Sequence, residues 1–537
     1  KAADMFGHVL VQDQKGRTKP LYTLSSDILR KVTHKNSFEG LTPVQVFLGI
    51  YFDFTHWQNV PLIRVSNSAI AGQIGIKGNL AAFTDIVDFK NNGYYKLGEN
   101  VQKAYSKRPA ERNKYDKEII KTDERVNIVY MIYTGEFMRL FPMRDSLGTW
   151  GNSEAALKRA FSHDDSLYLG NILPMFAEVA GKGDRQQASQ IAASISEYQR
   201  RFAGYALPPE RKTAAEVFFV KAGFFEKLFP FYATVGIIML AWLIIMLIRG
   251  AAAGKLFNRV ALGLLSAGFL VHTAGLALRW YVSGHAPMSN GYESMVFISW
   301  VTMLAGLIFS RKSPFVLPAT AVLSAMTLLV AHMSFMDPEI TNLVPVLKSY
   351  WLTLHVSVIT SSYAFLGMGA VLGLIVMILL SLTGPGNIKA AVAAIESLTV
   401  INYRTLTVGL YLLTIGTFLG AIWANESWGR YWGWDPKETW SLITIIVYSF
   451  VTHSKMIPSF RNIYAFNLMA LIAFSSVLMT YFGVNYYLSG LHSYAGGDPL
   501  PVPVFVYIAV IVLAGLSAVA YINYKKLDTG TQPDGSE

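Results

Sequence analysis

Apolar and polar positions divide the chain into two parts. Up to about residue 226 they mix with helical spacing, and beyond it apolar runs of membrane-spanning length follow one another. A run of roughly 20 apolar residues can cross the hydrocarbon core of a bilayer as one helix. We predict nine spans, at about 229–248, 260–280, 295–310, 315–335, 351–382, 405–425, 439–457, 462–483 and 504–523. The expected fold is an all-α polytopic membrane protein.

The first 226 residues have the pattern of a separate domain that is mainly α, or α+β with a small sheet. Thr42 followed by Pro43 favours a helix start, because proline suits the first helical turn, and Asn152 is a good N-cap. We predict helices from Pro43, over 124–141, from Asn152 to about Phe161 and over 185–203, and a strand over 60–66. The predicted division is an N-terminal domain at 1–226, a membrane domain at 227–524 and a polar tail at 525–537.

Basic residues in the short loops predict the orientation of the spans. They gather after the first, third, fifth, seventh and ninth spans, at Arg249, Lys255, Arg259, Arg311, Lys312, Lys389, Arg404, Lys455, Arg461, Lys525 and Lys526. Cytoplasmic loops are rich in lysine and arginine, so these loops are expected to be cytoplasmic. The N-terminal domain is then expected to be extracytoplasmic, and the C-terminus cytoplasmic.

Composition excludes several classes of protein. Hydrophobic residues make up 52% of the chain and charged residues 15%, which a soluble domain of this length does not need. The net charge of +11 owes much to the membrane topology, so we predict no nucleic-acid partner. The absence of cysteine excludes a cysteine nucleophile or a thiolate metal site in these 537 residues. The chain opens on lysine, and we expect it to be the C-terminal part of a longer protein.

A tryptophan-rich loop at 423–442, which we call the Trp loop, joins the sixth and seventh predicted spans. Its sequence WANESWGRYWGWDPKETW holds five of the eleven tryptophans in the chain. Aromatic residues, glycines and acids alternate there, at Trp428, Gly429, Trp432, Gly433, Trp434, Asp435 and Glu438. Interfacial tryptophan is common at membrane surfaces, so an anchor in the membrane lipid is the simpler interpretation. The density of rings also predicts a flat aromatic surface for a large planar ligand.

Histidines supply the second candidate chemistry. His355 lies at the outer start of the fifth span, and His492 lies in the outer loop after the eighth. Two imidazoles on the same membrane face as the Trp loop could provide both axial ligands of a heme. Taken singly, each could instead bond headgroups or a backbone carbonyl. His453 and His272 lie within spans, where an ionisable group suggests function, although neutral imidazole can also be structural.

The segment WGRYWGWDPKETWSL resembles the WWD signature of the heme-handling proteins of cytochrome c maturation. The matching residues are Trp428, Gly429, Trp432, Trp434, Asp435, Glu438 and Leu442. GHAPMSNGYESMVFISW at 284–300 and PVLKSYWLTLHVSV at 345–358 are similar to the CcsA branch, the C-terminal half of the fused system II cytochrome c synthetases (CcsBA). The resemblance is close from about 260 to 520 and looser over 1–226.

This resemblance implies a reaction and a set of heme ligands. His355 and His492 match the two outer histidines that ligate heme beside the WWD loop, and His453 matches a transmembrane heme ligand. In the family the partner of His453 lies in an N-terminal CcsB-like membrane portion, which is not in this sequence. The implied activity is that of a heme lyase in the bacterial inner membrane, which joins heme b to the CxxCH cysteines of apocytochrome c.

The charged residues of the Trp loop have two interpretations. We expect Asp435 and Glu438 to brace the loop by accepting hydrogen bonds from N–H groups. Arg430 and Lys437 are candidate contacts for heme propionates by charge, or else solvated loop residues. Two other functions stay open at this point. One is a heme exporter or chaperone that forms no thioether, and the other is a transporter of another substrate.

Overall fold

The computed structural model of the chain is mostly helical. It describes all residues except 1, 90–92, 144, 146–147, 206, 252–253, 334–335, 385, 489, 493–501, 503 and 531–537. The chain forms two compact units. One unit, called here the N-terminal unit, comprises residues 1–222 and 339–342, and the other, the helical unit, comprises 223–338 and 343–537.

The N-terminal unit packs helices around an apolar core, with four small antiparallel hairpin sheets. Its helices are α1 (Ala2–Phe6), α2 (Leu21–Thr33), α3 (Pro43–Phe52), α4 (Phe54–Trp57), α5 (Ser68–Ile74), α6 (Phe83–Ile86), α7 (Gly98–Ser106), α8 (Lys114–Tyr133), α9 (Ser153–Leu157), α10 (His163–Lys182), α11 (Arg185–Phe202) and α12 (Glu210–Ala222). The paired strands are β1 (Leu10–Gln12) with β2 (Thr18–Pro20), β3 (Ile63–Arg64) with β4 (Leu80–Ala81), β5 (Val87–Asp88) with β6 (Tyr94–Tyr95), and β7 (Phe141–Pro142) with β8 (Trp150–Gly151).

Local capping explains which predicted helices of this unit are right. α3 begins at Pro43 as predicted, because Thr42 and Gln45 form a capping box in which each side chain bonds the backbone of the other. α11 also agrees with the prediction. The helix predicted at 124–141 is wrong in its bounds, because Asn113 caps α8 ten residues earlier and Gly135, at φ 74°, follows its end. α9 stops at Leu157, and the predicted strand is only two residues long.

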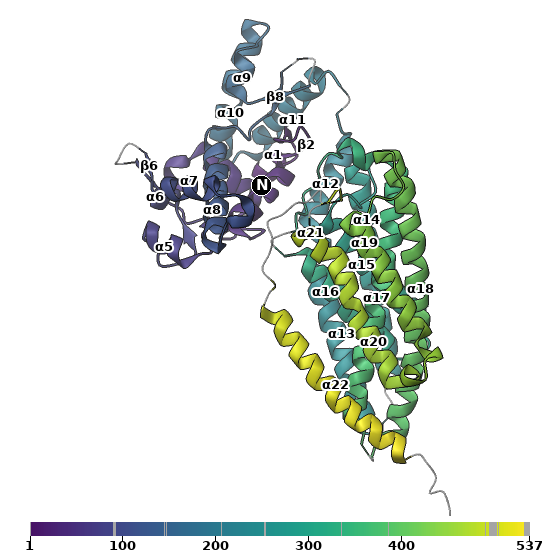
Figure 1. Cartoon of the computed structure of the whole chain (residues 1–537). Coiled ribbons are helices and arrows are strands. Elements are labelled where there is room, and N and C mark those ends of the chain that lie inside the picture. Colours follow the sequence, from purple (N-terminus) through teal and green to yellow (C-terminus); the bar gives the residue numbers. More distant parts are fainter. Residues whose placement is uncertain are drawn as a thin grey trace, which may run out of the picture. The chain divides into compact units, whose positions relative to one another are not determined.

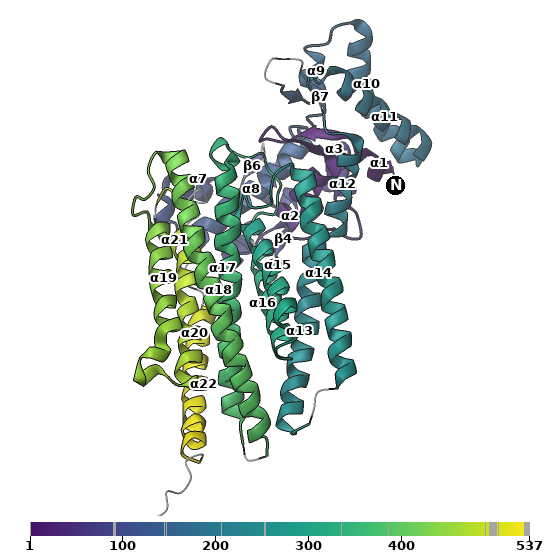
Figure 2. The same cartoon turned by 90° about the vertical axis from the view of Figure 1, so that its right-hand side faces the viewer.

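The helical unit consists of long apolar helices that run side by side (Figures 1 and 2). They are α13 (Phe224–Ile248), α14 (Lys255–Ser283), α15 (Gly291–Phe309), α16 (Val316–Ala331), α17 (Tyr350–Leu382), α18 (Ile388–Trp428), α19 (Pro436–His453), α20 (Ile463–Leu478), the short α21 (Val484–Tyr487) and α22 (Val504–Gly530). A π-helical turn, Met479–Gly483, continues α20. The chain is thus a polytopic membrane protein, as predicted.

Comparison with the predicted spans shows where hydropathy was incomplete. Seven helices in the described part are long and apolar enough to cross a membrane. The predicted fourth and seventh spans form α16 and α19, which do not meet those limits of length and apolarity. α18 begins at Ile388, well before the predicted 405, and α22 continues through 525–530 of the predicted tail. The rest of that tail, 531–537, lies outside the described residues.

Close contact between α17 and α18 sets the position of one candidate ligand. Gly409 of α18 faces Leu366 so closely that a Cβ there would lie 2.6 Å from Leu366 Cδ2. Farther along the same helix, Gly416 lies against the backbone of Ile359, where a Cβ would be 3.0 Å from its amide nitrogen. Small residues let membrane helices approach in this way. The approach brings the N-terminal part of α17, with His355, against the backbone of α18.

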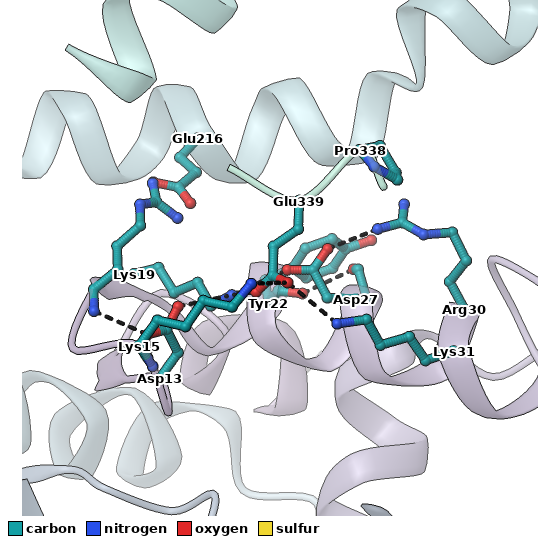
Figure 3. Close-up of polar contacts among 12 residues, drawn as sticks. Asp13, Lys15, Lys19, Tyr22, Asp27, Arg30, Lys31, Glu216, Pro338 and Glu339 are labelled. Carbon is teal, nitrogen blue, oxygen red and sulfur yellow. Dashed lines mark hydrogen bonds and ion pairs between the residues drawn. The ribbon is translucent and has the colours of Figure 1, made fainter. Parts of the chain in front are cut away.

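A buried ion cluster lies in the N-terminal unit (Figure 3). Lys19 is fully buried, and its Nζ is 2.8 Å from Glu339, 3.1 Å from Asp27 and 3.3 Å from Asp13. Glu339 comes from the segment 339–342, which the chain between α16 and α17 contributes to this unit. Burial would raise the pKa of Glu339, but the positive charges of Lys19 and Lys31 lower it to about 2.

Candidate functional site

A cavity of about 400 Å³ lies in the helical unit, at the ends of α15, α17, α18 and α19. His355 and His492 both line it, together with Trp423, Trp432 and Lys437. Its walls also carry polar side chains, among them those of Ser294, Thr360, Tyr363, Ser441, Tyr481 and Asn485. The two histidines predicted as a pair from their membrane face therefore share one cavity. A volume of this size lies within the range of small-molecule and cofactor sites.

His355 is held by the backbone of α18. Its Nδ1 is 2.7 Å from the carbonyl oxygen of Gly416, and because a carbonyl can only accept, Nδ1 donates. The ring lies against Gly420, where a Cβ would come within 2.6 Å of His355 Cε1. Nε2 has no hydrogen-bond partner among the described residues. The ring is thus fixed in the tautomer that leaves Nε2 free to bind a metal.

His492 follows α21 and is held by a carboxylate. Its Nδ1 is 2.8 Å from Oδ1 of Asp435, a residue that is only 6% exposed. Burial would raise the pKa of Asp435, but hydrogen bonds from Lys437, His492 and Leu491 lower it below its usual value. Burial lowers the pKa of His492 in turn. At neutral pH Asp435 is therefore an anion that accepts a hydrogen bond from the Nδ1–H group of a neutral imidazole. Nε2 again carries the free lone pair.

Trp423 packs against both histidine rings. Its ring is parallel to that of His355, at 7° and a centroid distance of 6.4 Å, and its centroid is 5.7 Å from that of His492. Trp428 contacts Trp423 and His492, with ring centroids 4.8 Å and 4.9 Å away. Trp423 is 1% exposed, and its indole N–H has no hydrogen-bond partner in the described structure. The sequence prediction gave Trp423 no role, although it begins the Trp loop.

The rest of the Trp loop is not a flat surface. Gly429 ends α18 in the left-handed conformation, at φ 71°. Trp432 lines the cavity, whereas Trp434 is 69% exposed and is not among the described lining residues. The two rings are perpendicular, at 89°. Trp434 also has φ 57°, an unusual conformation for an aromatic residue. The predicted planar surface is therefore wrong in shape. The aromatic side chains of this loop that line the cavity are Trp423, Tyr431 and Trp432, and Trp428 packs against Trp423 and His492.

The acidic residues of the loop bond backbone N–H groups. Glu438 accepts from the N–H of Gly433 at 2.7 Å and from that of Asp435 at 3.1 Å. Asp435 accepts from the N–H of Lys437 at 3.0 Å and from that of Leu491 at 2.6 Å. Together they form the capping box that begins α19. The bond from Asp435 to His492 adds a function that the sequence did not indicate.

The two basic residues of the loop differ in position. Lys437 lines the cavity, and its Nζ is 3.4 Å from the carbonyl oxygen of His492. Burial lowers the pKa of Lys437 to about 8, partly opposed by Asp435, so its amine is mostly protonated at neutral pH. Arg430 is not among the described residues that line the cavity, and its guanidinium packs on Gly433 instead. Lys437 is accordingly the better placed partner for an anionic group of a ligand.

The remaining histidines lie away from this cavity. His453 ends α19, where its ring is exposed and Nδ1 is 2.8 Å from the carbonyl oxygen of Ser449. His272 is fully buried in α14, with Nε2 3.1 Å from the carbonyl oxygen of Val296. His285 and His332 each bond a backbone carbonyl through Nδ1. None of the four is among the described residues that line the cavity.

Comparison with known proteins defines the class of this chain. A family model described as cytochrome C assembly protein matches residues 288–492, which include His355, the Trp loop and His492. With its apolar helices, this makes the chain a polytopic membrane protein of cytochrome c biogenesis.

Individual relatives place the chain more closely. It is 38% identical to the cytochrome c biogenesis protein CcsA of Synechococcus sp. (strain CC9902) over 253 residues, 42% of this chain and 83% of that protein. It is 40% identical to CcsA of Prochlorococcus marinus (strain MIT 9303) over 260 residues, 42% of this chain and 80% of that protein. The chain belongs to the CcsA family of cytochrome c assembly proteins, which confirms the resemblance seen in the sequence.

One relative extends the similarity beyond the membrane region. The protein NrfI of Wolinella succinogenes is 44% identical over 528 residues, which cover 96% of this chain. The chain spans 57% of the length of NrfI. The N-terminal unit is thus shared with this larger relative, whereas the CcsA proteins match over less than half of the chain.

Proposed function

We propose that the protein is a cytochrome c synthetase that binds heme b between His355 and His492 and joins it to the cysteines of a CxxCH segment. One observation carries the proposal. Two imidazoles line one cavity. In each, Nδ1–H donates a hydrogen bond to a protein oxygen and Nε2 is free. Histidines that bind metals usually have this arrangement, because the second nitrogen is held by a carbonyl or a carboxylate. A heme iron accepts two such ligands, one on each face.

The cavity walls suit the rest of a heme. Trp423, Tyr431 and Trp432 supply apolar contact for a porphyrin ring, and Trp428 supports Trp423. The ammonium group of Lys437 fits a propionate. Heme is here a substrate, which the protein holds while the reaction proceeds.

The proposed reaction needs no nucleophile from this chain. A substrate thiol adds across a heme vinyl group, so that sulfur bonds one vinyl carbon and hydrogen is transferred to the other. No electron is gained or lost in this addition. The chain contributes by holding the iron and orienting the vinyl groups, which is catalysis by positioning. This division of labour agrees with a sequence that has no cysteine.

His453 is proposed to serve a separate heme stage within the membrane. It ends α19, whereas Asp435 and Lys437 at the opposite end of that helix contact His492. The 18 residues of α19 span about 27 Å at 1.5 Å per residue, so one heme cannot use both His453 and the cavity histidines. The exposed ring fits a second ligand from a CcsB-like membrane portion. We place the cavity and N-terminal unit on the periplasmic side of a bacterial inner membrane, from the distribution of basic loop residues.

Coexpression with an apocytochrome c tests the proposal. We expect a cytochrome with covalently bound heme, detected by its mass and by resistance to acid–acetone extraction, and a bis-histidine spectrum in the purified synthetase. His355→Gly and His492→Gly should each lower heme content, and added imidazole should restore part of it. Heme binding without thioether formation would identify an exporter or chaperone. Absence of heme binding would support a transporter of another substrate.

A further inference from the structure

The two candidate heme ligands are held by chemically different partners. The Nδ1–H group of His355 donates a hydrogen bond to a neutral acceptor, the backbone carbonyl of Gly416, at 2.7 Å. The Nδ1–H group of His492 donates a hydrogen bond to the carboxylate of Asp435, at 2.8 Å. Both bonds are short, so the difference lies in the charge of the acceptor. Hydrogen bonds to ionised acceptors are about twice as strong as neutral ones.

Asp435 is fixed on several sides, and its carboxylate cannot easily turn away from His492. Oδ1 also accepts the N–H of Lys437, and Oδ2 accepts the N–H of Leu491, the residue next to His492. Gly490 packs directly on Oδ2, so closely that a Cβ at this position would collide with it. Asp435 therefore holds both the ring of His492 and the backbone that carries it.

A carboxylate behind an imidazole increases the electron density at the opposite nitrogen. Such partners raise the basicity of a metal-bound histidine, and their loss typically costs 10- to 100-fold in metal affinity. A backbone carbonyl also raises the basicity of the imidazole, but by less, because it carries no net charge. His492 should consequently be the stronger donor to iron, above all to ferric iron, and His355 the weaker one.

We propose that Asp435 makes His492 the ligand that the iron keeps, so that His355 is the ligand replaced by the imidazole of the CxxCH substrate. The inference rests on the heme site proposed above and adds an order of events to it. In the exchange, the bond from iron to His355 Nε2 breaks and a bond to the substrate histidine forms. No proton or electron is transferred, because His355 stays neutral and bonded to Gly416. Asp435 is thus a positioning residue that acts through His492.

Hemin titration of the single glycine variants tests the order of the ligands. Both variants should bind hemin more weakly than the wild-type chain, but His492→Gly should be weaker than His355→Gly by at least about tenfold. With hemin, a reductant and a synthetic CxxCH peptide, His355→Gly should form more thioether than His492→Gly, because the peptide histidine can occupy the vacant position. Equal binding and equal yields, or the reverse order, would overturn the inference.

Asp435→Asn separates electronic tuning from structure. Asparagine has nearly the same shape and is an equally good N-cap, so α19 should persist. Its amide oxygen can replace Oδ1 and still accept from Lys437 and His492, whereas its NH2 group replaces Oδ2 and loses the bond from Leu491. We expect the bis-histidine spectrum to remain and ferric affinity to fall about tenfold relative to ferrous, which raises the reduction potential by about 59 mV. Glu426→Gln is the matched control, because this carboxylate bonds Ser349 and touches neither histidine. Its potential should stay at the wild-type value.

The outcomes distinguish this inference from the proposed function. If the wild-type chain binds no hemin and forms no thioether, the proposed function is wrong. If the wild-type chain does both, but Asp435→Asn keeps the wild-type potential, only the role of Asp435 is wrong. An Asp435→Asn protein that has lost its bis-histidine spectrum would count against the inference too, unless the folded fraction measured by circular dichroism has fallen equally.

Discussion

Individual side chains, more than the volume of the cavity, decide which ligand it can bind. His355 and His492 are usable as ligands because their Nδ1 atoms already donate to Gly416 and Asp435. Trp423 packs against both imidazoles, and its buried indole N–H has no hydrogen-bond partner among the described residues. A small change beside one of these rings should therefore alter binding without unfolding the helices.

Gly420→Ala should displace His355. The added Cβ would lie 2.6 Å from His355 Cε1, closer than real contacts permit, so the ring must turn away from Gly416. We expect hemin affinity to fall at least about tenfold, as after loss of a metal-ligand partner. Gly263→Ala is the control, because its Cβ meets nothing within 4 Å and alanine favours the helix by about 1 kcal/mol. Equal hemin affinity in both variants, measured by absorbance titration, would contradict the assigned position of His355.

Trp434 should matter for the substrate protein more than for heme. Its ring is 69% exposed and its backbone has φ 57°, so an unfavourable conformation presents an apolar ring to the surroundings. We expect Trp434→Ala to leave the hemin spectrum unchanged and to lower cytochrome maturation about tenfold, which corresponds to ~1.4 kcal/mol. Trp434→Phe should keep most of the activity. If the Ala variant inserts normally and matures cytochrome at the wild-type rate, the ring is only a lipid anchor.

At the scale of elements, the ends of helices build the site, whereas a strand, a helix and a separate chain segment build the ion cluster of the N-terminal unit. The end of α18, the start of α17 and the capping box of α19 supply the cavity, so helix termini rather than helix middles hold its chemistry. In the N-terminal unit, Lys19 at the end of a hairpin and Asp27 in α2 bind Glu339 in a separate chain segment. Such a buried cluster depends on pH, since one uncharged member leaves the others without compensation.

Acid should destabilise the N-terminal unit through Glu339. Its pKa in the folded chain is about 2, below the ordinary 4.5, so its stabilising effect is full above pH 4.5 and declines as the pH falls toward 2. Lys15, Lys19 and Lys31 face this carboxylate, at 3.6, 2.8 and 3.2 Å. We expect a loss of up to about 3 kcal/mol over that range, visible as a falling melting temperature.

Two variants check that assignment. Glu339→Gln should flatten the acid dependence, because the group that titrates is absent. Lys19→Met should destabilise the unit at pH 7 by about 3–5 kcal/mol, since it leaves buried carboxylates without their cation. Lys103→Met, which removes an exposed ion pair with Glu99, should leave the melting temperature nearly unchanged, because water screens this pair. A steep acid transition that persists in Glu339→Gln would show that other carboxylates dominate.

At the scale of the whole molecule, the two ends of α19 suggest two stages of one pathway. The N-terminal end holds Asp435, which bonds His492, and the C-terminal end holds His453, with its ring exposed. We expect His453→Ala to lower the heme content of preparations from cells. Hemin added afterwards should bind the cavity with wild-type affinity, because neither cavity ligand has changed.

His332→Ala provides the control for that experiment. His332 likewise bonds a backbone carbonyl one helical turn earlier, and it has no proposed heme function. The His332→Ala substitution should leave both heme content and cytochrome maturation unchanged. Normal heme content and normal maturation in His453→Ala would remove the membrane stage and return His453 to a structural role.

Much of the architecture could be predicted from the sequence because the signals are local. Apolar runs identify membrane helices since the cost of placing polar groups in lipid depends on the segment itself. The start at Pro43 could be predicted from Thr42 and Pro43, which are adjacent in the chain. The motif around Trp434 and Asp435 likewise predicts heme chemistry near the start of α19. By contrast, the start of α18 at Ile388 required knowledge of its packing, because polar and small residues reduce the hydropathy of 388–404.

Only the tertiary structure decided which residues meet. The bond from Asp435 to His492 joins segments on either side of α19 and α20, and hydropathy contains no information about such pairs. Trp423 contacts two histidines from different segments, and the fold exposes Trp434 although Trp432, two residues earlier, lines the cavity. Side-chain partners across long sequence separations depend on how helices pack against one another. The sequence by itself therefore determined the class of protein and the types of residue that could carry its chemistry, whereas the packing of α17, α18 and α19 determined which of them meet in the cavity.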